Sequence, residues 1–123
     1  MSLTFPASFA DGNEFSDLLD EPTRVALEVA SVRCAFEDGM FMDAWQLAWS
    51  LEQRLAGSGR WQEIVVTQEL ALAAAVRLGD WLLEGQARVT LGRACLALGD
   101  VRRGGPQLAE GTVILRALGV PSS

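Results

Sequence analysis

The sequence contains no histidine and no tyrosine. Histidine is the commonest general base near neutral pH and a frequent metal ligand, so its absence removes most nucleophile–base pairs and most zinc sites. We therefore expect a protein that is not an enzyme and that binds no metal or cofactor. Carboxylates are the remaining candidates, and Glu14, Asp17, Asp20 and Glu21 lie close together in the chain. Their spacing matches no calcium loop, which favours a solvated acidic segment in which Asp20 or Glu21 caps a helix.

Cysteine is scarce and lysine is absent, so every cation is an arginine. Cys34 and Cys95 each lie inside an apolar helical pattern, which predicts two buried free thiols; a disulfide or redox pair is the alternative. No apolar run approaches the roughly 20 residues that a membrane-spanning helix needs, and no secretory signal pattern is present. We expect a cytoplasmic protein without membrane contact.

Basic charge is also lacking, because the net charge at pH 7 is −6. Residues 1–43 hold nine acidic residues and two arginines, whereas the rest of the chain is nearly balanced. Nucleic-acid binding depends on a basic patch, so we expect no nucleic-acid partner for this chain. Its 123 residues suffice for one domain that folds without a metal or a disulfide.

Glycine is present at a regular interval of twenty residues: Gly39, Gly59, Gly79, Gly99 and Gly119. A glycine just past a helix adopts the left-handed conformation that ends the helix at little cost. Asp80 and Asp100, each directly after a glycine, are good N-caps for the next helix. The repeated unit is therefore a helix of about 16 residues followed by a tight turn.

This interval predicts an all-α fold of five helices over about 22–37, 42–56, 61–78, 81–98 and 102–118. Short connections make consecutive helices antiparallel. The segment 81–98 is apolar on two sides, which predicts a helix covered on both, and Gly92 within it predicts close approach of a neighbour. Gly104, Gly105 and Pro106 interrupt the last helix, which we expect to begin near Pro106 or to bend there. An acidic arm over 1–21, partly disordered, precedes the helical domain over 22–120.

A helical hairpin with a period of forty residues is typical of an α-solenoid. The pattern formed by Ala87, Leu91, Gly92, Cys95 and Gly99 looks like the first helix of a tetratricopeptide repeat, with small residues in the following helix at Gly104 and Gly111. The stretches AWQLAWSLEQRLAGSGRWQE, ALAAAVRLGD and LGRACLALGD resemble the C-terminal repeat regions of bacterial transcriptional activators of the SARP type and ATPases of the NB-ARC type, and the resemblance covers roughly residues 24–119. The resemblance implies a TPR-like superhelix that contacts partners or senses signals. The sequence contains no phosphate-binding loop and no basic recognition helix.

From the repeats and the missing catalytic chemistry we expect a regulatory module that binds a protein or peptide in a groove. The candidate binding residues are Trp45, Trp49, Arg102 and Arg103. Trp45 and Trp49 lie one helical turn apart on one face, and the alternative is that they fill the core. Arg102 and Arg103 stand at a helix N-terminus, where they would hold an anion or a partner's carboxylate; the alternative is solvated surface arginines.

Two other functions fit the same sequence. The concave face of the stack would bind a small ligand and act as a sensor. Alternatively, the last helix is apolar around much of its circumference, which predicts a symmetric homodimer or tetramer that buries Val113, Ile114 and Leu118.

Overall fold

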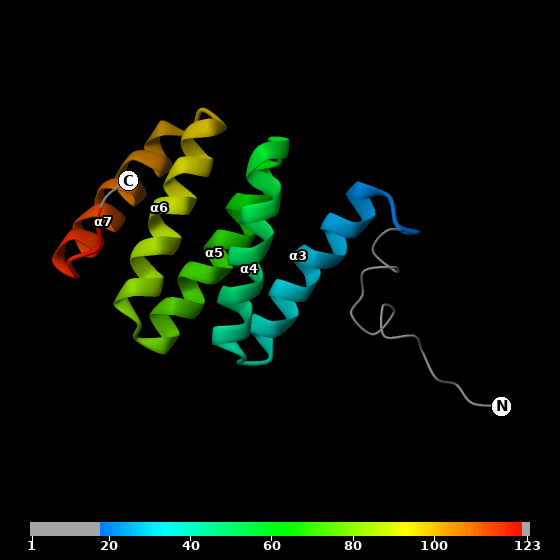
Figure 1. Cartoon of the computed structure of the whole chain (residues 1–123), viewed down its shortest axis with the longest axis horizontal. Helices are drawn as coiled ribbons and strands as arrows, with labels where there is room; N and C mark the ends of the chain where they lie inside the picture. Colours follow the sequence, from blue (N-terminus) through cyan, green and yellow to red (C-terminus); the bar gives the residue numbers. More distant parts are fainter. Residues whose placement is uncertain (1–17, 122–123) are drawn as a thin grey trace.

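The computed structural model describes residues 18–121, and this part of the chain is all-α, without a strand. Its helices are α3 (Glu21–Glu37), α4 (Phe41–Leu55), α5 (Trp61–Leu78), α6 (Trp81–Ala97) and α7 (Val101–Ala117), with a 3-10 turn η1 (Ala56–Ser58) after α4. The five helices and their bounds confirm the prediction from the glycine interval. They form antiparallel hairpins stacked in a row in chain order (Figure 1). Most of the predicted arm over 1–21 lies outside the described residues.

The turns between helices repeat one geometry. All five glycines of the twenty-residue interval have a positive φ, between 69° and 84°, as expected for helix-ending glycines. At four of these turns the residue after the glycine donates its N–H to the carbonyl five residues earlier: Met40 to Ala35, Asp80 to Ala75, Asp100 to Cys95 and Val120 to Leu115. The chain therefore leaves α3, α5, α6 and α7 along the same local path.

Aspartate side chains cap three helices. Asp20 accepts a hydrogen bond from the Thr23 N–H at 2.8 Å, Asp80 from Leu83 at 3.1 Å and Asp100 from Arg103 at 3.2 Å. Both predicted caps after the glycines are confirmed, and Asp20 caps the first helix. The bonds to Thr23 lower the pKa of the Asp20 carboxyl, because they favour its ionised form.

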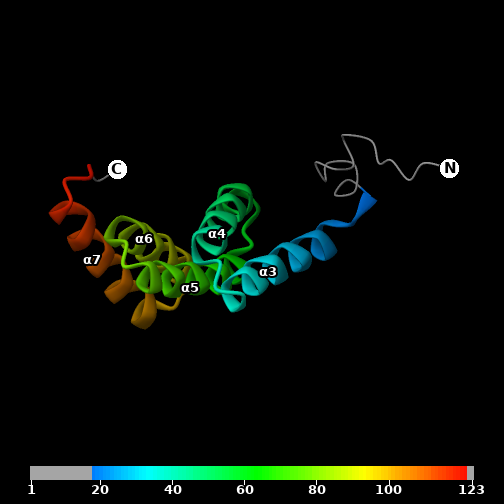
Figure 2. The ribbon, with the colours of Figure 1, turned by 90° about the horizontal axis from the view of Figure 1, so that it is seen from below.

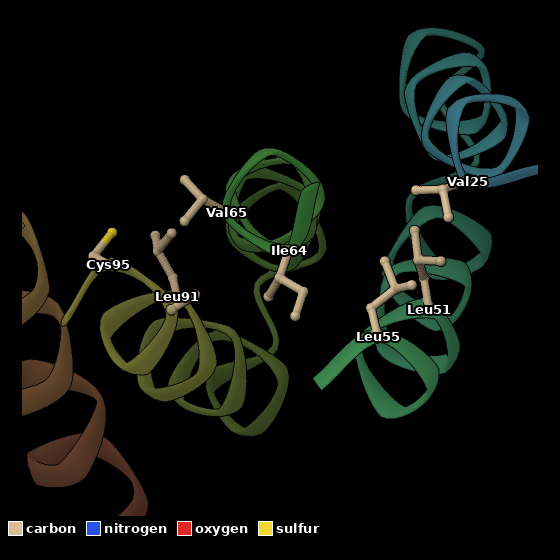
Figure 3. Packing of buried hydrophobic residues seen from close by; sticks show 8 residues of the cluster. Val25, Leu51, Leu55, Ile64, Val65, Leu91 and Cys95 are labelled. Atoms are coloured by element: carbon tan, nitrogen blue, oxygen red, sulfur yellow. The ribbon is translucent and has the colours of Figure 1, made fainter. Parts of the chain in front are cut away.

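The core runs through four consecutive helices. One cluster contains Val25 of α3, Leu51 and Leu55 of α4, Ile64 and Val65 of α5, and Leu91, Ala94 and Cys95 of α6 (Figure 3). Cys95 is 1% exposed, as predicted, and burial raises the pKa of its thiol. The prediction of a buried thiol is wrong for Cys34, which is exposed. Cys34 lies on α3, the first helix of the row, and among the described residues 18–121 this helix packs mainly against α4 and α5.

The last helix begins within one residue of its predicted range, 102–118, and not near Pro106. α7 begins at Val101, and Pro106 lies inside it. The cap from Asp100, together with the Gly104 N–H donating to the Asp100 carbonyl at 2.9 Å, starts the helix before the proline. Pro106 only removes the one N–H that would bond to the Arg102 carbonyl.

The row of helices is curved. Figure 2 shows α3 and α7 at its two ends turned toward the same side, with α4 and α6 toward the inside of the curve and α5 on the outside. As predicted, α6 is covered on two sides, by α5 and by α7. Over the described residues 18–121, no helix is both long and apolar enough to cross a membrane. The inner face carries the site described next.

Candidate functional site

A groove opens between α4, α6 and α7 on the inner side of the curve. Its volume is about 240 Å³. Its apolar floor and walls come from Trp49 of α4, Val89 of α6, and Leu108 and Leu115 of α7, and the chain after α7 adds Val120 and Pro121. Polar and charged side chains complete the lining: Gln86, Thr90 and Arg93 from α6, and Thr112 and Arg116 from α7.

Trp49 is held in the wall by a second tryptophan. The Trp45 and Trp49 rings stack with centroids 5.2 Å apart and planes 11° from parallel, which confirms that they share a face. Trp45 is buried, and its indole N–H donates to the Leu83 carbonyl of α6 at 3.1 Å. Trp45 is thus a core residue that joins α4 to α6. Trp49 is half-buried and presents the free part of its ring to the groove.

The groove has two arginines at its rim. Arg93 and Arg116 are exposed and make no ion pair with any residue in 18–121. Arg88 lies on the same stretch of α6 but does not line the groove, and it pairs with Glu84 at 3.0 Å and Glu110 at 3.4 Å. The hydroxyls of Thr90 and Thr112 donate to the carbonyls of their own helices, which leaves their oxygen lone pairs as acceptors.

One carboxylate lies near this rim. Glu52 of α4 is half-buried, and burial raises the pKa of its carboxyl, while the hydrogen bond from Gln53 and the positive charge of Arg93 act in the opposite direction. The charge at the groove therefore comes from two arginines, with one carboxylate of raised pKa nearby.

Arg102 and Arg103 lie elsewhere, around a second hollow between α5, α6 and α7, lined also by Glu69, Leu72, Leu91, Cys95, Pro106 and Gln107. Arg103 forms an ion pair with Glu69 of α5 and lies 3.8 Å from the Asp100 carboxylate. Its guanidinium thus binds carboxylates of this chain. Arg102 is exposed and has no ion pair within the described part of the chain.

Val113, Ile114 and Leu118 lie together on an outer flank of α7, where Trp81 and Ala117 complete a shallow hollow of about 350 Å³. Val113 is 65% exposed and Trp81 62% exposed, whereas Ile114 is half-buried because its side chain contacts the position of Gly85 on α6. The structure thus separates the predicted site residues into four places: Trp45 in the core, Trp49 in the groove, the arginine pair at the second hollow, and the apolar flank.

The residue types alone did not reveal the groove arginines. The spacing of Arg93 and Arg116 in the sequence matches no binding motif. The forty-residue period does, however, identify the positions in the preceding hairpin that are equivalent to some of the groove residues. That period places Val89, Thr112 and Leu115 where the preceding hairpin has Trp49, Leu72 and Ala75. Within residues 18–121, no three Cys, Asp or Glu side chains gather as a metal site. No family model, curated protein or solved structure matches the chain.

Proposed function

We propose that this chain is a non-catalytic module that binds a segment of a partner protein in the groove between α4, α6 and α7. In this proposal the module is regulatory and cytoplasmic. It is the sensing or partner-contacting part of a TPR-like regulator. The observation that carries this proposal is a groove of mixed lining, with Trp49 in one apolar wall and two arginines, Arg93 and Arg116, that form no ion pair within residues 18–121. Grooves in helical proteins bind a peptide or a helix through apolar anchor residues that are surrounded by polar groups.

The volume of the groove favours a protein segment over a small molecule. Pockets for drug-sized ligands measure about 300–1,000 Å³ and enclose most of the ligand. The groove, at about 240 Å³, is smaller than this range. It suits a few side chains of a longer segment that continues over the surface. The alternative of a small-ligand sensor predicts instead a metabolite that binds and quenches Trp49.

Selection of a displayed peptide library for binding to the chain tests the proposal. We expect enriched peptides that bind the chain and lose binding when Thr112→Phe fills the groove. Val113→Phe is the matched control, because the next residue of α7 lies on the exposed flank and not in the groove. Enrichment of no peptide, or peptides that bind the Thr112→Phe variant as well as the parent, would contradict the proposal. A metabolite panel run on the same two variants tests the sensor alternative.

A second candidate function is self-assembly into a homodimer. The exposed apolar flank formed by Trp81, Val113, Ile114 and Leu118 favours it, because large exposed apolar patches mark interaction sites. A dimer that uses this flank should dissociate in the Val113→Asp variant, measured as molar mass by light scattering over a dilution series. An unchanged mass would place any dimer contact elsewhere.

A further inference from the structure

The groove occupies the place that a further helix of the repeat would take. In the preceding hairpin, Trp45 and Ala48 of α4 and Ala71 and Ala75 of α5 form one buried cluster with Leu83 and Ala87 of α6, and Trp49 and Leu72 pack against it. These contacts hold α6 in place on the hairpin of α4 and α5. Forty residues later, Trp49, Leu72 and Ala75 correspond to Val89, Thr112 and Leu115, and all three line the groove.

The exit of the chain from α7 agrees with this placement. The Val120 N–H donates to the Leu115 carbonyl at 2.9 Å, as the Asp80 N–H donates to Ala75 where the chain turns from α5 into α6. The two turns share a glycine with positive φ, Gly119 and Gly79. Val120 and Pro121 then border the groove, at the positions where Asp80 and Trp81 begin α6. The chain therefore passes the groove along the same local path by which it enters α6.

The charge at the groove indicates which kind of protein segment binds there. Arg93 and Arg116 stand at its rim on different helices, and neither has an ion-pair partner in residues 18–121. Arginine pairs with carboxylates through well-directed, charge-assisted hydrogen bonds. A helix in the groove that carries Asp or Glu beside its apolar stripe would pair with both.

We infer that the groove binds an amphipathic helix of a partner protein, acidic at the edges of its apolar face, which packs on α6 and α7 as α6 packs on α4 and α5. This inference rests on the proposed function and deepens it by naming the form and the charge of the bound segment. The apolar face of the helix covers Val89, Leu108 and Leu115, and its acidic residues meet Arg93 and Arg116.

Two synthetic helical peptides test the inference. Both keep the inward-facing residues of α6 at their spacing, as in Leu83, Ala87, Leu91 and Ala94, and both have the length of α6. The acidic probe has Glu at the flanking positions, and the basic probe has Lys at the same positions. Titration calorimetry against the whole chain should show the acidic probe binding about tenfold more tightly than the basic one, the sum expected of two exposed ion pairs.

Charge reversal then tests the two arginines. The double variant Arg93→Glu, Arg116→Glu should lose the preference for the acidic probe and prefer the basic one. Arg102→Glu is the matched control, because it reverses the same charge on α7 beside the other hollow and should keep the acidic preference. Both probes should lose binding in the Thr112→Phe variant. Circular dichroism verifies that each variant remains helical.

Three results would overturn the inference: equal binding of the two probes, binding that survives Thr112→Phe, or no binding of either probe. The last result separates this inference from the proposed function. If peptides from the displayed library bind the groove while neither helical probe does, the module remains and the helical partner is wrong. If no displayed peptide responds to Thr112→Phe, the proposed function itself is wrong.

Discussion

Gly92 of α6 and Gly104 of α7 lie in direct backbone contact. A Cβ added to Gly92 would lie 2.9 Å from the Gly104 carbonyl oxygen and 2.7 Å from the Leu108 amide nitrogen. A Cβ added to Gly104 would lie 2.8 Å from the Gly92 carbonyl oxygen. A second such contact, between Gly85 and Gly111, follows seven residues away along both helices. The pair α6–α7, which forms most of the groove, is therefore joined by two glycine contacts two helical turns apart.

Gly92→Ala should destabilise the protein although alanine favours helices. Alanine gains roughly 1 kcal/mol of helix propensity over glycine, but it must push α7 away from backbone atoms. Overpacking of this kind costs about 1–3 kcal/mol, and the rigid backbone neighbours favour the upper end. We expect a net loss of about 1–2 kcal/mol in the free energy of unfolding, measured by urea denaturation followed by circular dichroism.

Gly105→Ala is the matched control for this prediction. It lies in α7 directly after Gly104, and a Cβ there meets no atom within 4 Å beyond its chain neighbours and its own helix backbone. We expect a change of less than about 0.5 kcal/mol, because the gain in helix propensity is offset by crowding between the new Cβ and the Cδ of Pro106. If Gly105→Ala costs as much stability as Gly92→Ala, the helices do not approach each other as closely as the structure shows.

Trp45→Phe should destabilise the chain far more than Trp81→Phe. Trp45 is buried, stacks on Trp49 and donates to the Leu83 carbonyl, so phenylalanine leaves a cavity and removes the link between α4 and α6. We expect a loss of about 2 kcal/mol, within the range for truncated core side chains. Trp81 is 62% exposed, and its replacement should change stability by no more than about 0.5 kcal/mol. Similar losses from the two substitutions would show that Trp45 is not a core residue.

Met40→Ser should stabilise the protein by adding a helix cap. Met40 is the N-cap of α4, has no side-chain cap bond and is 52% exposed. Its backbone, with φ −87° and ψ 70°, is nearly that of Asp100, with φ −90° and ψ 77°, whose carboxylate does cap α7. A serine hydroxyl there should accept from the Asp43 N–H and add about 0.5–1 kcal/mol to the free energy of unfolding. Met40→Ala, which cannot cap, is the control, and equal stability of the two variants would contradict the prediction.

The glycine interval made the fold predictable because each turn follows local rules that do not depend on distant contacts. Gly79 ends α5 and Asp80 caps α6 through bonds within the turn itself, so neither depends on the tertiary neighbours of the turn. The exposure of Cys34 depended instead on how many neighbours α3 has, and the start of α7 depended on a cap from Asp100 that outweighs Pro106. The candidate site was predictable only in part. Trp49 lies in the groove as an aromatic on a shared face, but Arg93 and Arg116 meet there because of the register in which α6 and α7 pack against each other.

Glu52 should give the folding stability an unusual dependence on pH. Burial raises the pKa of its carboxyl above the ordinary value near 4.5, so the native state holds a proton that the unfolded chain has already released. The stabilising contribution of this group is therefore complete below the ordinary value and is lost as the pH rises through the raised pKa. As the pH rises above about 4.5, the unsubstituted chain should lose more stability than Glu52→Gln, because the amide does not titrate. Unfolding in urea at a series of pH values measures the difference.

Asp20, whose pKa is lowered, acts in the opposite direction at more acidic pH in both proteins and cancels in the comparison. Parallel pH profiles for the parent and the variant would show that Glu52 is not desolvated in the native state.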